Sequence, residues 1–213
     1  MTRPTLYFVH GWACDAGLWD PLRAQLQDWP QAVAETGYFG APPQAVPAGP
    51  VIAIAHSLGG MKLLGAPLPD CRALVLINSF ARLGAAPGLG VPRRLLDRMR
   101  MRLRTQPRAM LADFHRQAGS DTGPPAGEPD IDRLDEDLLR LRDEDRLAEL
   151  RAWRRPLCSL AASADAIVPE ALSRADLPAP VHWHDGGGHM LPRSAAGWCA
   201  AHIRAFLETL PPQ

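Results

Sequence analysis

Ser57, Asp165 and His189 are the residues of this chain whose types and order could carry out acyl transfer. A serine hydroxyl is a weak nucleophile at neutral pH, so it needs an imidazole to accept its proton and a carboxylate to orient that imidazole. Each of the three residues follows a run rich in apolar or small residues, and such runs are typical of buried strands and the turns after them. We therefore predict Ser57 as the nucleophile, His189 as the general base and Asp165 as the orienting acid.

The neighbours of Ser57 indicate a sharp turn from a strand into a helix. In the sequence AHSLGG at 55–60, the small residues Ala55 and Gly59 stand two positions before and after the serine. This spacing fits the nucleophile elbow G-x-S-x-G, with alanine in the first glycine position, which raises the serine hydroxyl above the end of a sheet. The same pattern also occurs by chance in ordinary turns, so its weight depends on the rest of the chain.

The segment His10-Gly11-Trp12 follows another apolar run, at residues 5–9, and its glycine permits a tight backbone turn. Its backbone could present the Trp12 N–H to a reacting carbonyl group. The N–H of Leu58, which directly follows the serine, would be a second donor. We predict that these two N–H groups form an oxyanion hole, in which each donor lowers the barrier by about 3 kcal/mol.

Other arrangements of the same residue types compete with this interpretation. Asp165 could simply cap a turn, and Asp185 is a second candidate for the acid, although its closeness to His189 on one connection favours a loop role. His182 and His184 could form half of a zinc site with His189. Their spacing differs from the H-x-H-x-D-H of dinuclear hydrolases and no further ligand cluster occurs, so we expect no metal.

Apolar runs and amphipathic segments alternate along the chain. Strands are predicted at 5–9, 32–35, 51–56, 73–77, 156–161 and 181–185, and helices at 16–27, 60–64 and 194–207, the last with Ser194 as its cap. Prolines exclude a helix between residue 40 and the strand at 51. The alternation predicts an α/β fold with a mostly parallel, doubly wound sheet, in which ligands bind at the carboxyl ends of the strands.

Residues 81–153 differ from the rest, because charged helical segments broken by glycine and proline replace the apolar strands. We predict a helical cap inserted into a core made of residues 1–80 and 154–213. Its charge is uneven, since residues 93–116 contain eight arginines and two aspartates, whereas residues 128–146 contain nine carboxylates and four arginines. The two parts could neutralise each other through salt bridges, or the arginine-rich part could bind an acidic partner.

The composition of the whole chain argues against several classes of protein. Lys and Arg number 23, as do Asp and Glu, so the formal net charge is zero and nucleic-acid binding is not expected. No apolar run reaches membrane-spanning length and no export signal is recognisable, so we expect a cytoplasmic monomer that does not bind membranes. We expect reduced thiols at the four widely spaced cysteines, Cys14, Cys71, Cys158 and Cys199.

Four segments resemble the α/β-hydrolase superfamily over nearly the full chain: HGW at 10–12, AHSLGG at 55–60, SADAIVP at 163–169 and GGH at 187–189. Within it, the chain is most similar to the pimeloyl-acyl-carrier-protein methyl ester esterases of biotin synthesis. These share the HGW opening, the SLGG elbow, the D-x-x-V-P acid loop and a helical cap. The chain departs from them at Ala55, at residues 35–40, where ETGYFG replaces D-x-P-G-x-G, and in lacking a helix before the elbow.

The resemblance implies an α/β-hydrolase fold and a serine carboxylesterase that needs no cofactor. Its substrate would be the methyl ester of an acyl chain on acyl carrier protein, with substrate contacts expected at Trp12, Phe80 and Met190. Two alternatives stay open. One is a hydrolase of free small esters or of thioesters, and the other is a non-catalytic binding protein with the same fold.

An acidic carrier protein would need a basic surface near the substrate site. Acyl carrier proteins are strongly acidic, and an arginine-rich helix beside the entrance to the site would steer them toward Ser57. We expect this docking surface at four arginines of the cap: Arg93, Arg94, Arg98 and Arg102.

Overall fold

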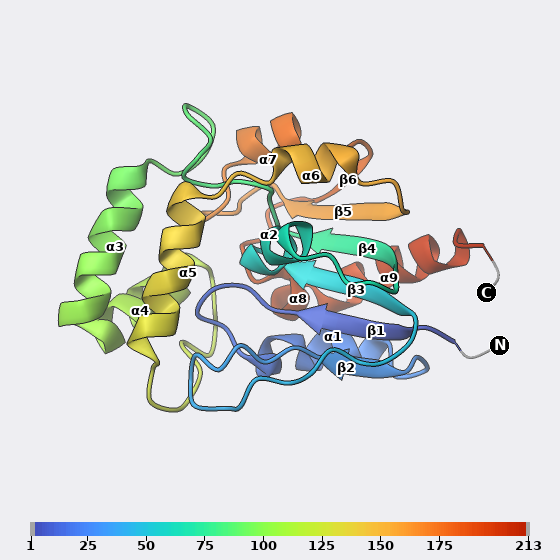
Figure 1. The fold of residues 1–213 in the computed structure, drawn as a ribbon, viewed down its shortest axis with the longest axis horizontal. Helices are drawn as coiled ribbons and strands as arrows, with labels where there is room; N and C mark the ends of the chain where they lie inside the picture. Colours follow the sequence, from blue (N-terminus) through green and yellow to red (C-terminus); the bar gives the residue numbers. More distant parts are fainter. Residues whose placement is uncertain (1–2, 212–213) are drawn as a thin grey trace.

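Six parallel strands form the centre of the computed structural model, which describes residues 3–211 (Figure 1). They lie in the order β2-β1-β3-β4-β5-β6, and each neighbouring pair is parallel. The chain therefore winds outward from β1 in both directions, which confirms the predicted doubly wound α/β sheet. The strands are β1 (Thr5–Val9), β2 (Gln31–Val33), β3 (Val51–His56), β4 (Cys71–Ile77), β5 (Leu157–Ala162) and β6 (Val181–His184).

Helices follow most of the strands. They are the 3₁₀ helix η1 (Ala16–Trp19), α1 (Asp20–Gln25), α2 (Leu58–Gly65), α3 (Arg93–Thr105), α4 (Pro107–Gln117), α5 (Ile131–Asp143), α6 (Leu147–Ala152), α7 (Glu170–Asp176), α8 (Leu191–Ser194) and α9 (Ala196–Glu208). Between β2 and β3 the described chain forms no helix, as the prolines of that segment predict.

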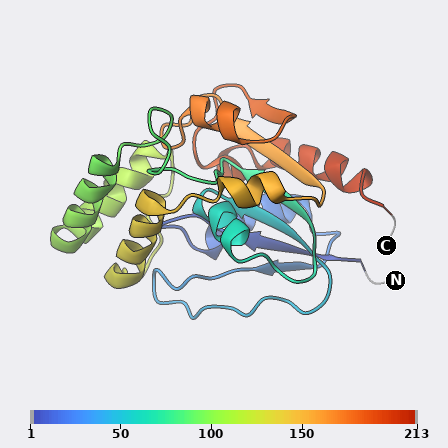
Figure 2. The same ribbon diagram turned by 45° about the horizontal axis from the view of Figure 1, so that its top comes forward.

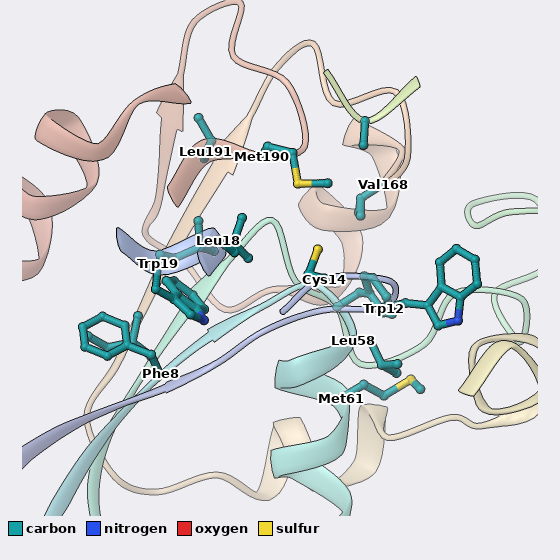
Figure 3. Close-up of a cluster of buried hydrophobic side chains, with 14 of the residues drawn as sticks. Phe8, Trp12, Cys14, Leu18, Trp19, Leu58, Met61, Val168, Met190 and Leu191 are labelled. Carbon is teal, nitrogen blue, oxygen red and sulfur yellow. The ribbon is translucent and has the colours of Figure 1, made fainter. Parts of the chain in front are cut away.

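Alternate side chains of the strands pack into two apolar layers. On β1, Leu6 and Phe8 belong to one layer, and Tyr7 and Val9 belong to the other. The helices α1, α8 and α9 pack together on the first face, where the ring centroids of Phe8 and Trp19 lie 5.2 Å apart (Figure 3). The helices α2 and α6 cover the second face. Because both faces are covered, the central strands are continuous apolar runs.

Three helices of the inserted segment, α3, α4 and α5, lie beyond the carboxyl ends of the strands, on the side away from both ends of the drawn chain (Figures 1 and 2). α3 packs against both α4 and α5. The fourth inserted helix, α6, packs against α2, because Leu147 and Leu150 join the apolar layer on the second face of the sheet. The segment between β4 and β5 thus lies in two places: α3, α4 and α5 lie beyond the strand ends, and α6 covers part of the second face of the sheet.

Two predicted helices differ from the structure in detail. The segment expected as one helix at 16–27 is η1 followed by the short α1, because Asp15 caps the first piece and Pro21 stands at the start of the second. The helix expected at 194–207 is divided into α8 and α9, and the N-cap of α9 is Ala195. Ser194 was the wrong cap, because its hydroxyl donates to the carbonyl oxygen of Met190 instead.

No helix in residues 3–211 combines the length and the apolar character that a membrane span requires. The four cysteines are all buried and none is in a disulfide. Burial raises the pKa of the Cys14 and Cys199 thiols to about 12, so both stay protonated at neutral pH.

Candidate active site

Ser57 lies at the turn between β3 and α2, with φ of 53° and ψ of −126°. A non-glycine residue rarely adopts such a conformation, and it is the strained turn expected of a nucleophile elbow. Gly59 permits α2 to begin this close to the end of β1, because a Cβ there would overlap the Val9 carbonyl oxygen and lie 2.9 Å from the His10 carbonyl oxygen. The Ser79 hydroxyl donates to the Ser57 carbonyl oxygen at 2.6 Å, which ties the turn to the end of β4.

The three residues predicted to act together are in hydrogen-bond contact. Nε2 of His189 lies 3.0 Å from Oγ of Ser57, and Nδ1 of His189 lies 2.8 Å from a carboxylate oxygen of Asp165. The His189 and Asp165 side chains are only 1% and 2% exposed. An ionised carboxylate can only accept, so Nδ1 carries the proton and Nε2 offers its lone pair to the serine hydroxyl. This tautomer is the one that can remove the serine proton.

The carboxylate of Asp165 is held by its own loop. Its other oxygen accepts the backbone N–H groups of Ile167 and Val168 at 2.7 and 2.9 Å. Burial alone would raise the pKa of Asp165, but the nearby His189 and these hydrogen bonds outweigh burial and lower that pKa below its usual value. Asp165 therefore stays ionised at neutral pH and can orient the imidazole.

The competing candidates lie in other surroundings. Asp185 is exposed, and its carboxylate lies 3.4 Å from a serine hydroxyl in the loop after β5. His182 packs at a tilt against His202 with 4.8 Å between ring centroids, and His184 packs edge-on against Trp198 at 5.1 Å. Within residues 3–211, no three His, Cys, Asp or Glu side chains gather closely enough to hold a metal ion.

Both segments predicted to supply the oxyanion hole adjoin Ser57. Leu58 is the first residue of α2, and N–H groups in the first turn of a helix have no partner within the helix. The loop after β1 passes close to the serine, because a Cβ on Gly11 would lie 2.7 Å from the Ser57 Cβ. Glycine is therefore needed for the backbone beside Trp12 to approach Ser57. The role of the two N–H groups stays a prediction.

Residues of the cap hold the loop that contains Trp12. Its indole N–H donates to the Leu134 carbonyl oxygen of α5 at 2.9 Å, and its ring meets Phe114 of α4 edge to face with 4.8 Å between centroids. The next residue, Ala13, has φ of 55°, and its carbonyl oxygen accepts from His115 Nε2 at 2.7 Å. The cap thus supports the conformation of the backbone beside Ser57.

A cavity of about 620 Å³ lies between Ser57 and the cap. Two of the predicted substrate contacts, Trp12 and Phe80, line it, and Met190 instead lines a second cavity of about 380 Å³. Three charged residues also line the larger cavity, namely Arg98, Arg102 and Asp113. Most of its remaining wall is apolar and comes largely from the cap, including Leu95, Leu96, Met99, Met110, Phe114 and Leu141.

The four arginines predicted to bind a carrier protein differ in their surroundings. Arg102 pairs with Asp113 at 2.7 Å, and Arg93 lies 3.9 Å from a carboxylate of α5. Arg94 and Arg98 are exposed, and in the described part of the chain neither has a carboxylate within ion-pair distance. Positive charge is therefore available on α3 at these two residues.

Salt bridges also join α3 to α5, as the opposite charges of the two segments predict. Arg100 and Arg104 both bind the carboxylate of Asp135, at 2.8 and 2.5 Å, and that side chain is 6% exposed. Arg142 of α5 binds Asp97 of α3 at 2.7 Å. Mutual neutralisation therefore accounts for part of the charge on the cap.

The sequence patterns do not single out two further residues of the site, His56 and Asn78. Nε2 of His56 and Nδ2 of Asn78 each donate to the carbonyl oxygen of His189 at 2.9 Å. Burial and the nearby His189 lower the pKa of His56 to about 3, so its ring is neutral at physiological pH. One signal could have found them, because each is a polar residue at the end of an apolar strand run, beside the same sheet edge as Ser57.

Several solved structures are similar to this one. A bromoperoxidase from Bacillus anthracis has a TM-score of 0.81 and 15% identity, covering 97% of this chain and 92% of that one. An esterase from Exiguobacterium antarcticum has a TM-score of 0.77 and 13% identity, covering 98% and 93%. The enol-lactonase from Burkholderia xenovorans has a TM-score of 0.75 and 15% identity, covering 98% and 92%. At these identities the likeness shows the fold alone.

Comparison with curated protein sequences finds no match. The family model described as the alpha/beta hydrolase family matches residues 20–202, which is most of the chain. The fold and the placement of Ser57 at a strand-to-helix turn agree with that match. The chain belongs to the alpha/beta hydrolase family.

Proposed function

We propose that this chain is a serine carboxylesterase in which Ser57 attacks the ester, His189 transfers protons and Asp165 orients His189. The observation that carries this proposal is the continuous hydrogen-bonded relay from Ser57 Oγ through both ring nitrogens of His189 to Asp165. A protein that only binds ligands has no need of these three groups in this order. The relay therefore favours an enzyme over a non-catalytic binding protein.

The reaction proceeds in two halves. Nε2 of His189 takes the hydroxyl proton as Oγ of Ser57 bonds to the ester carbonyl carbon, and the carbonyl electron pair moves onto oxygen. The N–H groups of Trp12 and Leu58 stabilise that oxyanion. The imidazolium then protonates the departing alcohol oxygen as the C–O bond breaks, which leaves an acyl-serine. Water attacks this acyl group by the same proton transfers and releases the acid.

The cavity supports an ester with an apolar acyl part. Its volume of about 620 Å³ lies within the usual range for small-molecule sites, and its walls are mainly aliphatic and aromatic. Together with the motifs shared with pimeloyl-acyl-carrier-protein methyl ester esterases, this favours a methyl or similarly small ester of a medium-length acyl chain. Carrier delivery is supported by the exposed Arg94 and Arg98 on α3, neither of which has a carboxylate within ion-pair distance among residues 3–211.

Hydrolysis of free small esters or thioesters is the second candidate. The salt bridges between α3 and α5 favour it, because they give the charge of the cap a structural role that needs no carrier protein. The fold does not decide between these candidates, since a bromoperoxidase, an esterase and a lactonase have similar structures.

The nucleophile is tested by labelling and by substitution. A fluorophosphonate should modify Ser57, as located by mass spectrometry of the digested protein. Ser57→Ala should abolish labelling and lower kcat on a methyl ester by about a millionfold, because the attacking atom is lost. Ser194→Ala serves as the control and should keep the parent activity. If pure Ser57→Ala protein retains more than a trace of activity, the nucleophile lies elsewhere.

Carrier docking is tested on paired substrates, the same acyl methyl ester free and on an acyl carrier protein. Arg94→Glu should raise KM for the carrier-bound ester and flatten its salt dependence, because steering by exposed charge is screened within about 8 Å at physiological ionic strength. Arg94 does not line the cavity next to Ser57, so hydrolysis of the free ester should not change. Arg108→Glu on α4 is the control for net charge. An equal loss on both substrates would exclude docking at Arg94.

A further inference from the structure

The carbonyl oxygen of His189 is held by two side chains from neighbouring strand ends. Nδ2 of Asn78 and Nε2 of His56 both lie 2.9 Å from it. All three residues are almost fully buried, with Asn78 2%, His56 0% and His189 1% exposed. A carbonyl oxygen has two lone pairs, so these donors occupy both acceptor sites. The backbone of His189 is therefore fixed at this atom independently of its imidazole.

Asn78 also connects the end of β4 to β5 and to the loop after β6. Its Nδ2 donates to the Gly188 carbonyl oxygen at 2.9 Å, and its Oδ1 accepts the Ala162 N–H at 2.8 Å. These partners define which end of the amide is the donor, because one end meets an N–H and the other meets two carbonyl oxygens. The φ of 45° at Asn78 is a conformation that asparagine tolerates better than most residues.

The chain before His189 cannot hold it in place by itself. Three glycines at 186–188 precede His189, and glycine restricts the backbone less than any other residue. The imidazole must nevertheless meet Ser57 and Asp165 at the same time, at 3.0 and 2.8 Å. A small displacement of the His189 backbone would lengthen one of these contacts.

The geometry points to Asn78 as a positioning residue for His189, with His56 as the second donor to the same carbonyl oxygen. This role rests on the proposed function, in which His189 transfers the serine proton. Asn78 touches neither the substrate cavity nor the reacting atoms, and it acts through the backbone of His189. Misplacement of a proton-transfer group by about 1 Å can cost about 100-fold in rate.

Asn78→Asp tests this role with little change in size. At alkaline pH the new carboxylate can still accept the Ala162 N–H but has no hydrogen to donate to His189. We expect kcat to fall by about 100-fold with KM unchanged. We also expect a change in the proton NMR signal of His189 Nδ1–H, which its hydrogen bond to Asp165 places far downfield. A residue that only stabilises the fold would leave that signal unchanged.

Matched variants separate positioning from general damage to the core. Ser159→Ala removes a buried hydroxyl of β5 that has no hydrogen-bond partner among residues 3–211, and it should keep the parent kcat and signal. His56→Gln retains an N–H donor and should keep most of the activity, whereas His56→Phe should not. If Asn78→Asp destabilises the fold, Asn78→Ser offers a smaller donor that should partly restore the signal.

Parent-like kcat and an unchanged Nδ1–H signal in folded Asn78→Asp would overturn the positioning role, and so would a lower kcat with an unchanged signal. The NMR readout does not depend on the substrate. If the parent protein hydrolyses no ester but its Nδ1–H signal still changes in Asn78→Asp, the proposed function fails while the positioning role stands.

Discussion

Two buried groups, Glu35 and His56, each depend on one protonation state. Glu35 accepts the N–H groups of Ala16 and Gly37, and His10 lies 3.7 Å away. Burial alone would raise the pKa of Glu35, but its contacts with His10 and these N–H groups lower that pKa to about 2. His56 is the opposite case, since burial keeps it neutral. Glu35 holds the segment after β1, and His56 holds the loop that contains His189, only while their charges stay unchanged.

Asp165→Asn should lower kcat by about ten-thousandfold, less than the loss of the nucleophile itself, because an amide favours the wrong tautomer of His189. The measurement is steady-state hydrolysis of a methyl ester. Asp185→Asn is the matched control, because Asp185 lies on the loop before His189 but is exposed. If Asp185→Asn were the more damaging change, Asp185 would be the orienting acid.

His56 should make the protein less stable as the pH falls. Between its ordinary pKa of 6.5 and its native pKa of about 3, the unfolded chain binds a proton at His56 that the native protein does not bind. In this window the free energy of unfolding should fall by about 1.4 kcal/mol per pH unit from this group. Urea unfolding at several pH values gives the free energy of unfolding as a function of pH, and this free energy should fall less steeply with falling pH in His56→Gln than in the parent protein. An equal pH dependence in the two proteins would contradict the buried neutral state.

At the scale of elements, the site exists because β1 and the start of α2 approach without side chains between them. Gly11 lies against the Cβ of Ser57, and Gly59 lies against the Val9 carbonyl oxygen. Both contacts leave no room for a Cβ. Parallel pairing of β1 with β3, in which Val9 is opposite Ala55, brings the two turns to the same sheet edge.

Gly59→Ala should therefore destabilise the protein by about 3 kcal/mol or prevent folding, because backbone atoms must move to admit the new methyl group. Gly197→Ala is the matched control, since its Cβ would meet nothing within 4 Å and Gly197 lies in α9. It should stabilise the protein by about 0.5 to 1 kcal/mol. Thermal unfolding of the two variants measures both effects, and similar midpoints would refute the close contact at Gly59.

At the scale of the whole molecule, the cap and the core share one apolar cluster. Leu96 and Leu138 of the cap belong to the same buried cluster as Ile54 of β3. Polar contacts cross the same boundary, because Lys62 of α2 binds Asp137 of α5 at 2.5 Å and Tyr38 donates to the same carboxylate. The cap is therefore fastened to the sheet at several points.

We expect a single cooperative unfolding transition for cap and core together, since neither buries the shared cluster alone. Urea unfolding followed by tryptophan fluorescence and by circular dichroism should give coincident curves. Lys62→Met should lower the midpoint, because the buried Asp137 then keeps only Arg140, at 3.2 Å, of the two cations that it binds. Two separate transitions in the parent protein would show that the cap unfolds independently.

The sequence alone determined the order of the elements and the main chemical candidates. Apolar runs such as VIAIAH form strands because both faces of the sheet are covered, and the small residues around Ser57 reflect a turn that excludes larger side chains. The parallel alternation of strands and helices then predicts that Ser57, Asp165 and His189 follow strands at one edge. These features depend on local pattern and on a general rule of topology.

Only the tertiary structure decided which polar groups meet across that edge. It placed Asp165, and not Asp185, against His189, and it brought Asn78 to the carbonyl oxygen of a residue 111 positions away. It also placed Met190 in a different cavity from Ser57. Such contacts depend on distances of a few ångströms between separate loops. No periodicity or spacing within one segment encodes these distances, because they are set by how the strands, the loop with glycines 186–188 and the cap pack together.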